Sequence, residues 1–249
     1  MISEAGHWYT AEGEPRYTVI GKDGKERPTT LREARKEGWL PSVTTVMQVM
    51  AKPGLQRWKD ERLIDACMMY ADKIPTEISC DYDFARIKAG EIARNAADEG
   101  TKIHAAIERF LQGKWIDTKY EAHVDAAIRE LHKLSKDWPT VEKGFADEAY
   151  GYAGKIDLLN DEWVIDFKGK EFGEDDSIKA YDEHFMQLSA YERGIREGLE
   201  PRNQANIFIS RSHPGVARTV IHTIEQAERG WNMFKACLEL WQAQKRYLQ

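Results

Sequence analysis

The sequence predicts an α/β fold in which a central mixed β-sheet is flanked by helices on both faces, with a helical segment at the N-terminus. Residues 152–168 contain two β-type runs around a polar turn, which is the pattern of a β-hairpin. Two further β-type runs, residues 205–209 and 217–221, follow a helical stretch. Apolar residues at helical spacing recur around these runs, so we expect helices to cover the sheet on both sides.

Length and charge narrow the class of protein. A chain of 249 residues is long enough for one large domain and marginal for two. We expect residues 1–80 to form a mostly helical segment that packs on a core of residues 81–249, within one structural domain. The formal net charge of −6 and the sequence pI of about 5.7 exclude a globally basic nucleic-acid binder, but they leave room for a local basic groove.

Hydropathy and cysteine content predict a cytoplasmic protein. The first thirty residues contain no apolar run, so we expect no signal peptide. A mean hydropathy of −0.63 and the lack of a long apolar stretch argue against a membrane span. Cys67, Cys80 and Cys237 are odd in number and widely separated, which indicates free thiols in a reducing compartment and not a disulfide framework.

Short elements are expected after an irregular lead-in. Residues 17–24 have the composition of a strand and a turn, and Thr30 is a candidate cap for a helix over residues 31–37. Ser42 is a candidate cap for a second helix, which must end before Pro53.

The next helix is expected from Leu55 to about Tyr70, with Trp58 packed in the core. Residues 72–84 are polar and interrupted by Pro75, so we expect a connection there. The remaining expected elements are helices over residues 85–112, 120–136, 178–197 and 225–247, and a strand over residues 141–146.

The register of the central hairpin decides which side chains meet. If the loop after Leu159 holds two residues, Asp157 lies opposite Val164. If it holds four residues, Asp157 lies opposite Asp166. Either loop puts Asp157, Asp166 and Lys168 on one face, because side chains alternate along a strand. A three-residue loop would send Asp157 to the other face unless a bulge restored it.

Two carboxylates on one face of a hairpin need a compensating charge. Like charges that face each other across a ladder repel, and Lys168 alone is a weak partner for both Asp157 and Asp166. A divalent cation with a preference for hard oxygen ligands, Mg²⁺ or Mn²⁺, satisfies them better. A solvated hairpin edge with mixed charges is the alternative interpretation.

The pattern G-x-x-G-x-x-D over residues 151–157, followed by D-F-K at residues 166–168, resembles the active-site hairpin of the PD-(D/E)xK nuclease superfamily. It is most similar to the RecB-like branch, which includes phage and mitochondrial-type exonucleases. The resemblance implies a restriction-endonuclease-like fold. It also implies metal ligation by Asp157 and Asp166, and a Lys168 that positions or helps to deprotonate the attacking water.

Two helical motifs extend this resemblance. Residues 100–108, G-T-K-I-H-A-A-I-E, resemble the histidine motif of the same branch, which implies that His104 is a metal ligand. Glu108, one turn further on, either orients His104 or the metal-bound waters, or is a surface residue. Gln187 and Tyr191 resemble the Q-x-x-x-Y motif that follows D-x-K, where the pair supports DNA or the catalytic lysine.

The resemblance covers residues 41–195, with some departures. It implies that the Phe167 backbone carbonyl is a further metal ligand. Gly169 stands where many relatives have threonine.

Three scattered cysteines cannot supply a four-cysteine set, so we expect no iron–sulfur cluster. Glu142 and Glu148 precede the hairpin, and the sequence leaves open whether either faces the metal.

The expected function is that of a Mg²⁺- or Mn²⁺-dependent DNA exonuclease in phage or cellular recombination, repair or replication. Its expected partners are DNA ends, single-stranded or duplex, and a single-strand-binding or annealing protein, with no membrane. A structure-specific endonuclease for flaps or branches is one alternative, and a non-catalytic DNA-end-binding recombination partner is another. Polarity, strand preference, DNA versus RNA, endo versus exo cleavage and oligomeric state are left open.

Overall fold

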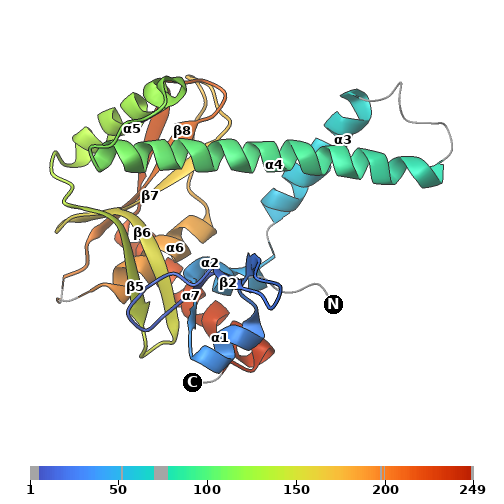
Figure 1. Ribbon diagram of the computed structural model, residues 1–249. Helices are drawn as coiled ribbons and strands as arrows, with labels where there is room; N and C mark the ends of the chain where they lie inside the picture. Colours follow the sequence, from blue (N-terminus) through green and yellow to red (C-terminus); the bar gives the residue numbers. More distant parts are fainter. Residues whose placement is uncertain (1–5, 52, 70–77, 197, 199, 248–249) are drawn as a thin grey trace.

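The computed structural model describes the chain except residues 1–5, 52, 70–77, 197, 199 and 248–249. It is a mixed α/β structure built on a five-stranded mixed sheet (Figure 1), as the sequence predicted. The β7–β8 pair is parallel, and the other three neighbouring pairs are antiparallel. The strands follow the order β5 (Thr140–Asp147), β6 (Tyr152–Leu159), β7 (Trp163–Lys170), β8 (Asn203–Ser210) and β9 (Ala217–Ile221).

Helices cover both faces of the sheet, and each face has its own apolar core. α4 (Ile78–Leu111) and α5 (Glu121–Leu134) bury the apolar residues of β7 and β8 on one face. α6 (Asp182–Gly194) and α7 (Ile224–Lys245) pack against β5 and β6 on the other face. Within the described residues, no helix combines the length and the apolarity that a membrane crossing requires.

Two predicted helix starts were wrong. α6 begins at Asp182 and not at residue 178, because Tyr181 is extended and its N–H is bound by His184 Nδ1 at 2.9 Å as a helix cap. α4 already begins at Ile78, so the predicted connection over residues 72–84 is shorter than expected. Its first part, residues 72–77, lies outside the described residues.

The N-terminal segment packs on the α6–α7 core and combines short strands with short helices. Thr30 and Ser42 cap helices as predicted, and Thr30 forms a full capping box with Glu33. The helix after Ser42 has only one α-helical turn, followed by a 3-10 turn. In chain order the elements are β1 (Trp8–Tyr9), β2 (Thr18–Ile20), β3 (Glu26–Pro28), α1 (Leu31–Glu37), β4 (Leu40–Pro41), α2 (Val43–Val46) and the 3-10 turn Met47–Val49.

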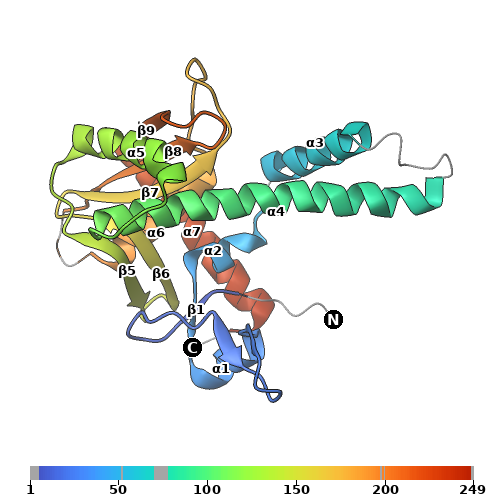
Figure 2. The same ribbon diagram turned by 45° about the horizontal axis from the view of Figure 1, so that its top comes forward.

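α3 (Pro53–Met69) lies beside the N-terminal half of α4, and the two helices project beyond the sheet (Figures 1 and 2). With 34 residues, α4 is about 51 Å long. Trp58 of α3 is half-buried and lines a surface hollow, so the prediction that it packs in the core was wrong. The helical spacing of apolar residues is the same for a core face and for a groove face, and only the tertiary position of α3 separates the two.

Candidate metal centre

The hairpin has the four-residue loop. Leu158 pairs with Ile165 and Leu159 pairs with Val164, so the register continues with Asp157 opposite Asp166. Ladder pairing between the described strands stops at Leu158. Beyond it, Asp157 Oδ2 accepts a hydrogen bond from the backbone N–H of Phe167 at 2.8 Å. A side-chain oxygen therefore replaces the backbone carbonyl that would accept this hydrogen bond in a regular ladder. β6 and β7 therefore separate where the two carboxylates lie.

The glycines of the hairpin motif have separate structural roles. Gly151 has a φ of +78° in the turn between β5 and β6, a conformation that favours glycine. A Cβ atom on Gly154 would lie 2.8 Å from the rings of both Phe145 and Tyr191. Gly154 therefore allows Tyr191 to lie against β6, next to the carboxylates.

α4 brings His104 to the hairpin. His104 Nε2 lies 2.8 Å from Asp157 Oδ2. The helix crosses β7 closely, since a Cβ atom on Gly169 would lie 3.3 Å from the Cα atom of Gly100. A Cβ atom on Gly100 itself would meet nothing within 4 Å. The close approach of helix and strand thus depends on the missing Cβ atom of Gly169, and the Cβ position of Gly100 faces open space.

Asp166 is held by side chains from three elements. It is 2% exposed. Lys168 Nζ donates to its Oδ1 at 2.8 Å, and Gln187 Nε2 donates to the same oxygen at 2.9 Å. Asn206 Nδ2 donates to Oδ2 at 2.8 Å. Lys168 Nζ also donates to Gln187 Oε1 at 3.0 Å, so lysine, carboxylate and amide form a closed set.

A second layer of hydrogen bonds fixes this set. Gln187 Nε2 donates to Tyr191 Oη at 2.9 Å, which places both residues of the Q-x-x-x-Y motif beside Asp166. Asn206 Oδ1 lies 2.8 Å from His222 Nε2. Because Asn206 uses its amide hydrogens on Asp166, its oxygen accepts, and His222 carries its proton on Nε2. Sequence reasoning missed Asn206 and His222, although an asparagine within an apolar strand was a usable signal.

Glu108 and Glu142 lie beside His104. One ligand atom from each of these three residues can be chosen so that all three atoms lie within 4.8 Å of one another. Glu142 has a φ of +58°, and the described β5–β6 ladder is interrupted at the Glu142–Asp157 position. This distortion turns Glu142 toward the site, where it also forms an ion pair with Lys155. Glu148 is exposed in the β5–β6 turn, away from His104.

The pKa values of the cluster indicate a surplus of negative charge. Burial disfavours the charged form of His104, but Asp157, Glu142 and Asp166 outweigh it and raise the pKa to about 9. Burial, with a contribution from Asp157, raises the pKa of Asp166 to about 6 against the opposing effect of Lys168. Burial also raises the pKa of Glu142. At neutral pH the protonated His104 thus supplies positive charge next to the carboxylates, which a bound divalent cation would supply instead.

Asp157 has a lowered pKa, in contrast to Asp166 and Glu142. Burial opposes its ionisation, but His104, Lys168 and the Phe167 N–H together hold its pKa below the usual value. It is therefore a carboxylate at neutral pH. The donor set of one imidazole nitrogen and several carboxylate oxygens fits Mg²⁺ or Mn²⁺.

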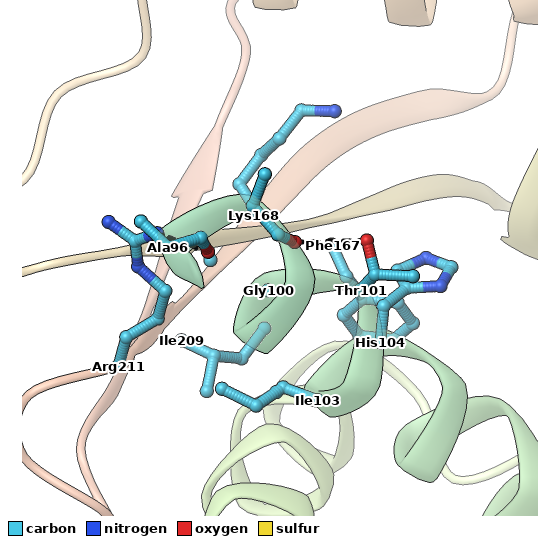
Figure 3. A pocket seen from close by; sticks show the side chains of 11 residues that line it. Ala96, Gly100, Thr101, Ile103, His104, Phe167, Lys168, Ile209 and Arg211 are labelled. Atoms are coloured by element: carbon cyan, nitrogen blue, oxygen red, sulfur yellow. Dashed lines mark hydrogen bonds between the residues drawn. The ribbon is translucent and has the colours of Figure 1, made fainter. Parts of the chain in front are cut away.

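A hollow of about 350 Å³ opens next to the cluster, and we name it the α4 hollow (Figure 3). His104 and Arg211 lie at opposite ends of it, with Gly100 between them. Lys168 and Phe167 line it from β7. The hollow gives a substrate access to the lysine and to the histidine.

Neither a search with protein-family models nor a search of curated proteins gave a match. The geometry of the site defines a carboxylate–histidine–lysine cluster on a separated β-hairpin with an adjoining hollow.

Proposed function

We propose that the protein is a Mg²⁺- or Mn²⁺-dependent DNA exonuclease of the RecB-like branch of the PD-(D/E)xK nucleases, with a restriction-endonuclease-like fold. The observation that carries the proposal is the separation of β6 and β7 at Asp157 and Asp166, with His104 and Lys168 each 2.8 Å from one of the two carboxylates. A solvated hairpin edge gives no reason to bury Asp166 or to bring His104 across from another helix.

The residues that would hold the metal are His104, Asp157, Asp166 and the Phe167 backbone carbonyl. Glu142 and Glu108 are added to this set because both lie beside His104. When bound, a divalent cation supplies an acidified water and neutralises charge on the phosphate.

Lys168 acts from a fixed position. Two hydrogen bonds from Nζ, to Asp166 and Gln187, leave one N–H for a phosphate oxygen or the attacking water. Lys168 therefore orients these groups by donating a hydrogen bond, and Gln187 determines where that donor points. Tyr191 and Asn206 keep the amide and the carboxylate in place.

The test is cleavage of end-labelled linear single-stranded, linear duplex and circular DNA with Mg²⁺, Mn²⁺ or EDTA. We expect metal-dependent loss of linear DNA, with circles spared. Asp157→Asn should lower the rate by more than about 100-fold. Asp161→Asn, an exposed aspartate in the turn of the same hairpin, is the matched control and should cleave like wild type.

Three other outcomes would change the proposed site or the proposed activity. Equal turnover by the Asp157 and Asp161 variants would refute the metal-ligand role. Cut circles would indicate an endonuclease. DNA binding without cleavage of any substrate would favour a non-catalytic end-binding partner.

A further inference from the structure

A second hollow, of about 290 Å³, adjoins the α4 hollow, and we name it the outer hollow. It lies between α3, α4 and the segment that follows β8, and Trp58 and Arg62 line it. Ala96 and Arg211 line both hollows. The two hollows thus adjoin at Ala96 and Arg211, with His104 and Lys168 on one side and α3 on the other, and we name the two together the path.

Small residues form the α4 side of this path. Ala96, Ala97, Gly100 and Thr101 are spaced so that they share one face of the helix. The position that a Cβ atom would take on Gly100 is empty to 4 Å. The helix surface beside the cluster is therefore open to an extended ligand.

Arg211 stands where the hollows meet, and its guanidinium is incompletely bonded. Nη1 donates to the Ala96 carbonyl at 2.6 Å, and Nη2 donates to Glu171 at 3.3 Å. Nε is screened from solvent and has no acceptor among the residues that the structure describes. An unpaired buried N–H is unfavourable, so the site favours a ligand that brings an acceptor.

In the outer hollow, a second arginine with an unpaired Nε lies next to an aromatic ring. The guanidinium carbon of Arg62 lies 5.6 Å from the Trp58 ring centroid, and Arg62 forms an ion pair with Asp65 at 3.0 Å. Its Nε is likewise buried without an acceptor within the described part of the chain. An aromatic platform beside arginines is how proteins hold unpaired nucleic-acid strands.

The carboxylates that line the outer hollow are compensated. Glu99 forms an ion pair with Lys119 at 2.9 Å, and Glu171 forms one with Arg211 at 3.3 Å. A phosphate in this hollow therefore meets arginine donors and carboxylates that already have cationic partners.

We propose that the path holds one unpaired nucleic-acid strand, with a backbone phosphate at Arg211 and a base stacked on Trp58. The strand leads to the phosphodiester that lies at His104 and Lys168. The inference rests on the proposed function and adds its substrate: an unpaired strand, since a base can stack on a side chain only when it is free of its own duplex.

The first experiment is fluorescence anisotropy of an end-labelled single-stranded oligonucleotide, with Ca²⁺ in place of Mg²⁺ and the label checked for integrity. Trp58→Ala should weaken binding by about 5- to 150-fold, and Trp58→Phe should retain most of the affinity. Arg211→Ala should lower the slope of log Kd against log salt by about one, which Trp58→Ala should not. Trp115→Ala, at a tryptophan that is 74% exposed, and Arg32→Ala on α1 are matched controls that should bind like wild type.

The second experiment separates this path from the metal cluster. Bis(p-nitrophenyl) phosphate is a small diester without bases, so its cleavage tests the metal cluster without a strand that could stack on Trp58. Trp58→Ala should cleave it at the wild-type rate but should show a raised KM for the oligonucleotide. Thermal unfolding of each variant reports whether its fold is intact, and Trp58→Phe tests the same ring position if Trp58→Ala does not fold.

The outcomes are distinguishable. Equal binding by Trp58→Ala and Trp115→Ala would overturn the inference, even if the wild type is a nuclease. Equal affinity for duplex, with the same dependence on Trp58, would overturn the requirement for an unpaired strand. Binding that depends on Trp58 and Arg211, without hydrolysis of either substrate by the wild type, would support the strand path and refute the proposed function.

Discussion

His222 should make the stability of the protein depend on pH in a predictable direction. It follows β9, is 7% exposed, and donates from Nε2 to Asn206. Its Nδ1 is buried and has no partner among the described residues. Burial lowers the pKa of His222 to about 4. The folded protein therefore keeps the imidazole neutral at a pH at which the unfolded chain would protonate it.

The size of the effect follows from the two pKa values. Above pH 6.5 the imidazole is neutral in both states and contributes no pH dependence. Below pH 6.5 the unfolded state binds the proton first, so the free energy of unfolding falls by about 1.4 kcal/mol per pH unit. The loss reaches about 2 kcal/mol at pH 5 and levels off near 3.4 kcal/mol below pH 4.

The assay is urea unfolding between pH 4.5 and pH 8, followed by tryptophan fluorescence, for wild type and His222→Gln. Glutamine can still donate to Asn206 but does not titrate. At pH 8 the variant should be less stable by about 1–2 kcal/mol, because it loses the fit of the imidazole against Phe185. By pH 5 this deficit should vanish, because only the wild type loses stability through His222.

Asp166 does not confound the comparison. Its pKa of about 6 is raised, so protonation of this carboxyl stabilises the folded state as the pH falls from about 6 to 3.8. The effect is opposite in sign to that of His222, but it is present in both proteins and cancels in their difference. Parallel stability curves for wild type and variant would refute the neutral, buried imidazole.

Three further predictions concern the cluster and its hollow. Gly100→Ala should raise thermal stability by up to about 1 kcal/mol, because it adds a helix-favouring methyl group in open space, while the same methyl group should lower DNA cleavage. Gln187→Ala should lower kcat by about 10- to 100-fold, with Mn²⁺ affinity by calorimetry nearly unchanged, because Lys168 loses its orienting acceptor. Glu142→Gln should weaken Mn²⁺ binding by about 10- to 100-fold, and Glu148→Gln should leave it unchanged.

The hairpin and its carboxylates were predictable because they depend on local rules. Side-chain alternation places Asp166 and Lys168 on one face whatever the loop length. The choice between a two-residue and a four-residue loop depends on Asn160, whose Oδ1 accepts the N–H groups of Glu162 and Trp163 and so closes the longer turn. The sequence contained this asparagine, but its bonding pattern was one of several that the turn allowed.

The residues that were missed or misjudged depend on distant contacts. Asn206 meets Asp166 only because β8 pairs with β7 in parallel, across a connection that contains α6. Glu142 faces His104 because its backbone leaves the regular strand conformation, which alternation cannot anticipate. Trp58 was assigned to the core because helical spacing does not identify what a helix face meets.

α4 links the two proposals because one helix carries both His104, a proposed metal ligand, and the small residues that line the proposed strand path. His104 lies one turn after Gly100, and Ala96 lies one turn before it. The position of the helix relative to β7 is limited by the contact of Gly100 with Gly169, where a Cβ atom added to Gly169, but not one added to Gly100, would force a shift of a few tenths of an ångström. A change in this contact therefore moves the histidine and the path together. If both proposals hold, a strand that lies against α4 is for the same reason held at a fixed distance from His104.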